Sequence, residues 1–215
     1  MQAATTLFAE KGYAATTIDG IAAEADVAVE TVYSRFGNKL TLLKAILEPA
    51  IVGNQSGVDI LELPEVAAIR VMTDQHQQVA GLAHLSRTIL ERSALGHRIL
   101  RTATAADPAA ADFERGDEQR RHHIQSAYIE MLRANGPFRP GLTTADAATT
   151  YSALANPATY ALLTVRCGWT PDHYERWLCD SLTLLLLVPG ARDSFVAAQD
   201  RKPSCAGPGA SQAQN

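Results

Sequence analysis

The chain has 215 residues, 47% of them hydrophobic and only 6% aromatic, with a formal net charge of −4 at pH 7. This size predicts one or two domains with a sizeable core, and the negative balance is not the basic footprint typical of nucleic-acid-binding proteins. The longest apolar run, Leu184–Val188, is far shorter than the ~20 residues that span a bilayer, so we expect a soluble protein with no membrane partner.

The N-terminal part of the chain has a pattern of short helices. A first helix is expected over Ala3–Lys11, with Gly12 as its end. Thr17 is a suitable N-cap for a second helix. The apolar face of that second helix recurs at three- and four-residue spacing and consists of Ile18, Ile21, Ala22 and Ala25.

A third short helix follows a turn at Asp26–Ala28. Its apolar face is Val32 and Phe36, Gly37 ends it, and Asn38 caps the next helix. Two short helices joined by such a turn are typical of the helix-turn-helix of DNA-binding proteins, whose second helix enters the major groove.

The outward side chains of this third helix are candidates for DNA contact. Thr31 and Ser34 can bond base edges or phosphates, and Val29 can pack on a thymine methyl. Tyr33 and Lys39 can hold the DNA backbone. The whole candidate face is Val29, Glu30, Thr31, Tyr33, Ser34 and Arg35.

Glu30 is open to two interpretations. It can accept a hydrogen bond from a cytosine amino group, or it can be a solvated charge that the helix N-terminus favours. Spacing alone leaves DNA binding and a plain helical core as alternatives, since short helix pairs also occur in bundles.

The segment Leu7–Leu43, LFAEKGYAATTIDGIAAEADVAVETVYSRFGNKLTLL, resembles the N-terminal domain of the TetR/AcrR family of transcriptional regulators. The resemblance implies an all-α homodimer that binds double-stranded operator DNA, with a larger domain that senses a small-molecule effector. It implies that Thr17 lies next to a phosphate, that Asp19 falls where some members contact a base, and that Tyr33 and Lys39 anchor phosphates.

The chain departs from the family pattern in three ways. The family usually has Gly and Ser where this chain has Asp26 and Ala28, so the turn loses a permissive residue and the recognition helix its usual N-cap. A short basic arm normally precedes the first helix, whereas this sequence starts at Met1, inside that helix, which leaves open whether residues are missing. Residues 1–50 carry four basic and six acidic side chains, a net charge of −2, so we expect a shallow salt dependence of DNA binding.

We predict an all-α fold of about nine helices in two domains. Residues 1–46 form the helix-turn-helix domain, residues 47–200 form a ligand-sensing and dimerisation bundle, and residues 201–215 form a disordered tail. The next helix is expected from Lys39 to about Val52, with a bend at Pro49, and another begins at Pro64. Two long helices are expected across 74–106, with a candidate break near Ser93–Gly96, and from Pro108 to Asn135. The last two are expected from an N-cap at Thr144 to Val165, with a kink at Pro157, and from Pro171 to Val188.

The last helix is apolar nearly all the way round in its second half, so it must be buried on more than one side. We expect one side to face a second copy of the chain. The predicted dimer interface is Trp177, Leu178, Leu182, Leu185 and Leu186.

The bundle is also predicted to hold an unknown small-molecule effector between its helices. Its candidate ligand-binding residues, each of which is also compatible with ordinary core, are Leu82, Leu85, Tyr128, Met131, Asn156 and Tyr160. The charged stretch from Glu114 to His123 is interpreted as a solvated face, and His84 and His97 as structural histidines.

No catalytic motif is present: there is no nucleophile elbow, phosphate-binding glycine loop or metalloprotease motif, so we predict no enzyme and no cofactor. Cys167, His173 and Cys179 lack the spacing and the fourth ligand of a metal site, so we predict no metal, two buried thiols and an exposed histidine. With Cys205, the three cysteines form no disulfide framework, which favours a reducing cytoplasm. A competing hypothesis is a dimeric helical protein that binds a small molecule and has weak or lost DNA binding.

Overall fold

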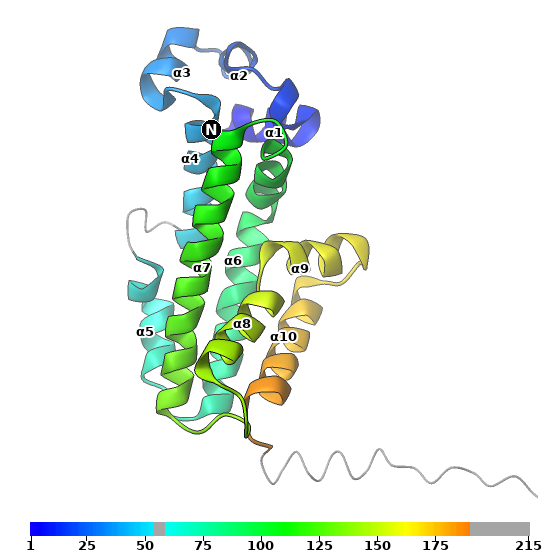
Figure 1. Cartoon of the computed structure of the whole chain (residues 1–215). Helices are drawn as coiled ribbons and strands as arrows, with labels where there is room; N and C mark the ends of the chain where they lie inside the picture. The colour runs from blue at the N-terminus through cyan, green and yellow to red at the C-terminus, as the bar shows by residue number, and fades with distance from the viewer. Residues whose placement is uncertain (54–58, 190–215) are drawn as a thin grey trace, which may run out of the picture.

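The computed structural model describes residues 1–53 and 59–189, and within these residues it contains helices and no strand. A small N-terminal group of helices lies at one end of a longer helical bundle (Figure 1). The predicted all-α fold, with a helix-turn-helix unit ahead of a helical bundle, is confirmed. The expected tail at 201–215 lies outside the described residues.

The N-terminal unit, called the head below, consists of α1 (Gln2–Ala15), α2 (Ile18–Glu24) and α3 (Val29–Phe36). Gly12 interrupts α1 with φ 76° and ψ 165°, which confirms that the regular helix ends there. Glycine adopts this positive φ at little cost. The extra turn after Gly12 brings Tyr13 into the core at 3% exposure.

The bundle, called the body below, has longer helices than the head. In order these are α4 (Lys39–Val52), η1 (Ile60–Glu62), α5 (Pro64–Arg70), α6 (Gln75–Ala103), α7 (Pro108–Ala134), α8 (Thr144–Leu154), α9 (Pro157–Ala161), η2 (Leu162–Arg166) and α10 (Pro171–Leu186). The expected break near Ser93–Gly96 is wrong, because α6 is continuous. Pro49 lies inside α4 without ending it.

The helix expected from Thr144 to Val165 is instead three segments, α8, α9 and η2, and its N-cap is Thr143. Pro157 has no N–H to donate, so the helix stops before it. The carbonyl of Ala153 accepts from Asn156 Nδ2 at 2.8 Å and from Thr159 Oγ1 at 2.9 Å. These bonds stabilise the break, so that α9 leaves α8 in a new direction (Figure 1).

The head and the body share one hydrophobic core. Leu7 and Phe8 of α1 lie in the same buried cluster as Leu47 of α4 and as Ile99 and Leu100 of α6. The expected domain boundary after residue 46 therefore falls inside the continuous helix α4, with no linker between the two parts.

Three residues of the predicted dimer interface belong to the chain's own core. Leu178, Leu182 and Leu186 of α10 are 0%, 1% and 0% exposed and pack in the body cluster. The outward apolar side chains of this helix are its neighbours Leu184 and Leu185, which are 66% and 45% exposed. Helical periodicity cannot tell which side of an apolar helix faces its own chain, and this explains the correction.

The turn between α2 and α3 contains a strained backbone position, and the gain in stability on removing this strain can be measured. Asp26 has φ 52°, the one positive φ of a non-glycine residue in the described part of the chain. We predict that Asp26→Gly raises the free energy of unfolding by about 0.5–1 kcal/mol, because the left-handed region costs L-residues energy that glycine avoids. Urea unfolding measures this.

The control is Ala25→Gly at the neighbouring position, where φ is −87° and glycine brings only flexibility. It is expected to lower stability by about 0.5–1 kcal/mol. A loss of stability for both variants would contradict the assignment of strain to Asp26.

Candidate nucleic-acid interface and ligand cavity

The two helices of the head are held in place by caps and by a small core. Thr17 Oγ1 accepts from the Gly20 N–H at 3.0 Å, as its predicted role as N-cap of α2 requires. Ile18 and Ala22 of α2 pack against Val32 of α3. Ala28, at the start of α3, offers no side-chain cap, so the free N–H groups of this helix start remain available to an anion such as a phosphate.

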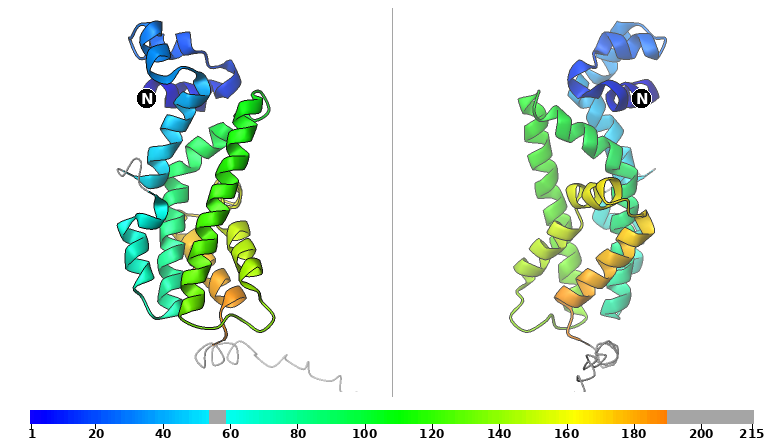
Figure 2. Two further views of the ribbon diagram at one scale, coloured as in Figure 1. Left: turned by 60° about the vertical axis from the view of Figure 1, so that its left-hand side comes forward. Right: turned by 90° about the vertical axis from the view of Figure 1, so that its right-hand side faces the viewer.

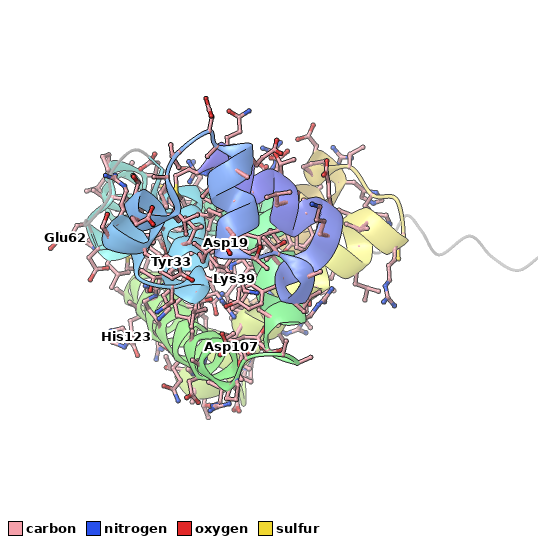
Figure 3. The ribbon with its side chains drawn as sticks, turned by 90° about the horizontal axis from the view of Figure 1, so that it is seen from above. Asp19, Tyr33, Lys39, Glu62, Asp107 and His123 are labelled. Atoms are coloured by element: carbon pink, nitrogen blue, oxygen red, sulfur yellow. The ribbon has the colours of Figure 1, made fainter. Side chains whose placement is uncertain are left out.

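The outer face of α3 is exposed. Tyr33 is 51% exposed, and the other exposed side chains of this face are Glu30, Thr31, Ser34 and Arg35. Val29 differs from the expectation, since it is half-buried and packs against the small head core. Asp19 is exposed on the first turn of α2, and Figure 3 looks onto this end of the molecule.

Lys39 is bound by the protein itself. Its Nζ donates to the carbonyls of Tyr13 at 2.6 Å and Thr16 at 2.8 Å and lies 4.3 Å from the centre of the Tyr13 ring. Burial lowers the pKa of Lys39, while Asp107 opposes this shift. Two of the three ammonium N–H groups are thus occupied, which leaves at most one for a DNA phosphate.

A hydrogen bond joins the head to the body at the same place. Tyr13 Oη donates to Asp107 Oδ2 at 2.9 Å, and Asp107 Oδ1 accepts from the Ala109 N–H at 3.0 Å as the N-cap of α7. Burial, with Asp107 nearby, raises the pKa of Tyr13 well above its usual value. Lys39 and Asp107 are both labelled in Figure 3. The corner between α6 and α7 is thereby attached to the segment that precedes α2.

A cavity of about 910 Å³ lies in the body between α6, α7 and the segment from α8 to η2. In the right-hand view of Figure 2, α9 lies across between α6 and α7. Of the predicted ligand-binding residues, Asn156 and Tyr160 line the cavity. The other four do not: Leu82, Leu85 and Tyr128 are buried in the body core, and Met131 packs against it.

Charged residues of α7 form much of the cavity wall, which sequence interpretation missed. Glu114, Glu118 and Arg121 line the cavity, so the interpretation of this stretch as a solvated face holds for the exposed Glu118 and fails for Arg121, whose side chain is 23% exposed. Asp117, 3% exposed, pairs with Arg120 at 2.8 Å and with Arg121. Spacing of three and four residues already placed Glu114, Glu118, Arg121 and Gln125 on one helix face, and this was the available signal.

A chain of hydrogen bonds joins the same α7 wall to Ser152 and Ala155 at the end of α8. Gln125 Nε2 donates to the Ala155 carbonyl at 2.8 Å, and Gln125 Oε1 accepts from Ser152 Oγ at 2.6 Å. His122 Nδ1 lies 3.0 Å from the same Ser152 hydroxyl. These side chains already have hydrogen-bond partners within the chain, so they shape the cavity and do not require hydrogen bonds from a ligand.

His97 faces the cavity from α6 in an environment that disfavours its charge. Burial, together with the cationic groups of Arg121 and Arg120, lowers its pKa to about 3. His97 is therefore a neutral imidazole at physiological pH. His84, the other histidine considered on this helix, is exposed and pairs with Glu175 at 3.1 Å.

The structure gives no support to a metal site in the part of the chain that it describes, where no three His, Cys, Asp or Glu residues gather in a metal-binding arrangement. Cys167 is exposed and Cys179 half-buried, so the expected burial of the thiols fails for Cys167; Cys205 lies outside the described residues. No helix described here is long and apolar enough to cross a membrane.

Comparison with known proteins identifies a protein family that the head resembles. Residues 1–46 match the family model described as bacterial regulatory proteins, tetR family. A curated relative, the HTH-type transcriptional activator FasR of Mycolicibacterium smegmatis, is 30% identical over 98 residues, which are 46% of this chain and 42% of FasR. The alignment thus spans less than half of that relative's length.

Solved structures resemble the whole described fold. A transcriptional regulator from Saccharomonospora viridis, solved in complex with choline, has a TM-score of 0.64 at 22% identity, covering 87% of this chain and 95% of that one. NalD, the secondary repressor of the MexAB-OprM multidrug efflux pump in Pseudomonas aeruginosa, has a TM-score of 0.61 at 23% identity, with 86% and 92% covered. At these identities the likeness establishes the fold alone.

The depressed pKa of His97 predicts an acid-sensitive contribution to stability. Below its ordinary pKa of about 6.5 the unfolded chain binds a proton that the folded chain does not, so folding stability falls with falling pH by at most about 1.4 kcal/mol per pH unit from this group. Partial solvent access reduces this limit. The contribution is fully present above about pH 6.5 and is lost progressively toward pH 3.

Urea unfolding of the wild-type chain and of His97→Gln between about pH 7 and pH 5 measures the effect as a difference. The wild-type chain is expected to lose more stability than the variant. His84→Gln, on the exposed part of the same helix, is the control. Equal pH dependence in the wild-type chain and His97→Gln would contradict the neutral, buried state of His97.

Proposed function

We propose that the chain, whose residues 1–46 match the family model of bacterial regulatory proteins, tetR family, is a ligand-responsive transcriptional regulator that binds operator DNA as a homodimer. The observation that carries this proposal is the exposed outer face of α3, presented on a head that shares its core with a cavity-containing body. In this proposal the chain acts by binding, and it carries out no catalysis.

The proposed DNA contacts come from α3 and the start of α2. Thr31 and Ser34 are placed to contact base edges, and Tyr33 and Arg35 to contact phosphates. Thr17 and Asp19 lie at the start of α2, where a side chain can meet the backbone or a base. Glu30 keeps its two interpretations, and Val29 contributes the part of its side chain that remains outside the small head core.

Lys39 is proposed to act mainly by position. Its ammonium joins the carbonyls of Tyr13 and Thr16, which lie on either side of the turn before α2. This contact fixes the start of α4 relative to α2, and hence the orientation of α3 between them. Any phosphate contact by Lys39 uses its one remaining N–H group.

The proposed dimer surface is the outward side of α10. Leu184, Leu185 and Val188 are 66%, 45% and 43% exposed, an unusual amount of apolar surface at the end of one helix. Trp177, half-buried on the same helix, extends this surface. A second copy would cover it, and two heads would then meet successive major grooves.

The effector is proposed to occupy the cavity between α6 and α7. The corner of these helices holds Asp107, which accepts from Tyr13 of the head. A ligand that separates or closes α6 and α7 would move this corner and with it the spacing of the two heads. The choline complex of the Saccharomonospora viridis regulator supports a ligand site in this fold. We favour a repressor released by its ligand, while the relative FasR is an activator.

The alternative is a dimeric helical protein that binds a small molecule and has weak DNA binding. The acidic balance of residues 1–50, with Lys39 held inside the chain, favours it. Selection of genomic fragments on the full chain, followed by fluorescence anisotropy with the enriched fragment, separates the two. Enrichment of no common sequence would favour the alternative and contradict the proposed regulator.

The sparse positive charge predicts a shallow salt dependence. We expect a slope of log K against log salt that corresponds to fewer than about six phosphates per dimer. Arg35→Ala should weaken binding to all sequences alike and reduce that slope by about 1 per head. Thr31→Ala with Ser34→Ala should instead relax sequence preference, at a cost of about 1–3 kcal/mol per lost base contact.

Ser126→Ala, at a half-buried position on α7 away from the head, is the control and should leave affinity unchanged. A steep salt slope, or an Arg35→Ala variant that binds like the wild-type chain, would show that the DNA-contacting surface lies elsewhere.

A further inference from the structure

The cavity between α6 and α7 is lined by buried and half-buried side chains that can donate hydrogen bonds to a ligand. Tyr160 is 4% exposed, and the Arg121 side chain is 23% exposed. His97 is mostly buried and, as a neutral imidazole, carries one N–H donor. In the part of the chain described, neither the His97 ring nor the Tyr160 hydroxyl forms a hydrogen bond, although both face the cavity.

The carboxylates of the cavity wall are placed differently. Glu91 is exposed and paired with Arg87 at 3.0 Å, so its charge is balanced within the chain. Glu118 is exposed and Glu114 half-exposed, so water can satisfy both of them. Among the polar groups of the wall that have no hydrogen-bond partner in the described residues, the most buried is therefore the Tyr160 hydroxyl, which can donate.

The local charge around His97 is positive. Arg121 and Arg120 are the charged groups that act on it, and both disfavour its protonation. Together they share the carboxylate of Asp117, and Glu114 also acts on Arg121. The cavity lining as a whole has four arginines and three glutamates, and one of these, Glu91, is already paired with Arg87 outside the lining. Further arginines stand at the rim, with no carboxylate within 4.0 Å among the described residues: Arg98, Arg101 and Arg166.

The rest of the lining is apolar. The segment from α9 to η2 supplies most of it, with contributions from α6, and the residues are Ala94, Leu95, Pro157, Ala158, Ala161, Leu162 and Val165. A volume of about 910 Å³ suits a ligand of drug size. The cavity thus combines buried donors and positive charge on one side with an apolar surface on the other.

We propose that the cavity takes an amphiphilic organic anion, whose carboxylate meets His97, Arg121 and Tyr160 and whose hydrocarbon part lies against α9 and η2. This inference rests on the proposed role of the cavity as the effector site. Arg121, which already pairs with Asp117, can add a charge-assisted bond to the carboxylate, and His97 and Tyr160 can each donate a neutral bond. A cationic ligand would leave the donors of His97 and Tyr160 without a partner.

Three probes of equal chain length test the charge preference: octanoate, 1-octanol and octyltrimethylammonium, titrated into the full chain by calorimetry without DNA. We expect octanoate to bind at least about tenfold tighter than 1-octanol, the gain of a hydrogen-bonded charge. The ammonium probe should bind no tighter than the alcohol. Equal affinity for all three probes, the tightest binding for the ammonium, or no binding at all would overturn the proposal.

Two variants locate the carboxylate. Tyr160→Phe keeps the ring that packs 4.9 Å from Tyr174 and removes the hydroxyl, and His97→Leu removes the imidazole. Each should weaken octanoate by about threefold to tenfold and leave 1-octanol unchanged. His84→Leu, on α6 outside the cavity, should change neither. Should His97→Leu fail to fold, Tyr160→Phe decides, and unaltered octanoate affinity in it would remove Tyr160 from the site and overturn the placement.

The readout separates this inference from the proposed regulator function. Octanoate binding by a chain that selects no DNA would uphold the anion site and refute the regulator. Operator binding by a chain that ignores octanoate would uphold the regulator and refute the anion site.

Discussion

The structure depends on the hydrophobic core that the head and the body share. Leu7 and Phe8 of α1 are buried against the end of α6 at Ile99 and Leu100, with Leu47 of α4 beside them. Gly96 of α6 makes this approach close, because a Cβ at that position would lie 2.7 Å from Leu47 Cδ1. Separating the head from the body would expose this cluster to water at roughly 25 cal/mol for each Å² of apolar surface. The head and the body therefore cannot turn independently of each other, because a shared core and the continuous helix α4 join them in place of a flexible linker.

Polar contacts give that packing a defined orientation. The Tyr13–Asp107 bond, at 2.9 Å, ties the head to the α6–α7 corner, and Lys39 closes the loop between Tyr13 and the start of α4. The same contacts reduce the positive charge that the head can offer to DNA. The charge of Lys39 thus fixes the position of α4 relative to α2, and the exposed face of α3 is the surface that remains to recognise a DNA sequence.

The cavity lies on the other side of the same corner. Two of its walls are α6, which ends at Ala103, and α7, which begins at Pro108. A change in the separation of these two helices therefore moves Asp107, which lies between them in the chain. A ligand can act on the head only to the extent that it binds the two arrangements of α6 and α7 with different affinity. The donors of His97 and Tyr160, which have no hydrogen-bond partner among the described residues, provide a reason for such a difference.

Local signals in the sequence predicted the helix starts well. Thr17 and Asn38 cap helices as expected, because an N-cap bond is decided within a few residues.

Tertiary features were harder to predict. Periodicity identified α10 as apolar but could not show that Leu178 faces its own chain while Leu184 faces outward. It also could not show that Arg121 lines a cavity, because that depends on the direction that α9 takes after Pro157.

The rigid connection between head and body can be tested by unfolding the chain in urea with two probes at once. Both tryptophans, Trp169 and Trp177, lie in the body, so their fluorescence reports on the body alone, while far-ultraviolet circular dichroism reports on all helices. A shared core predicts coincident transitions with one midpoint. Loss of part of the helical signal before any change in tryptophan fluorescence would mean that the head unfolds separately, and would contradict the account.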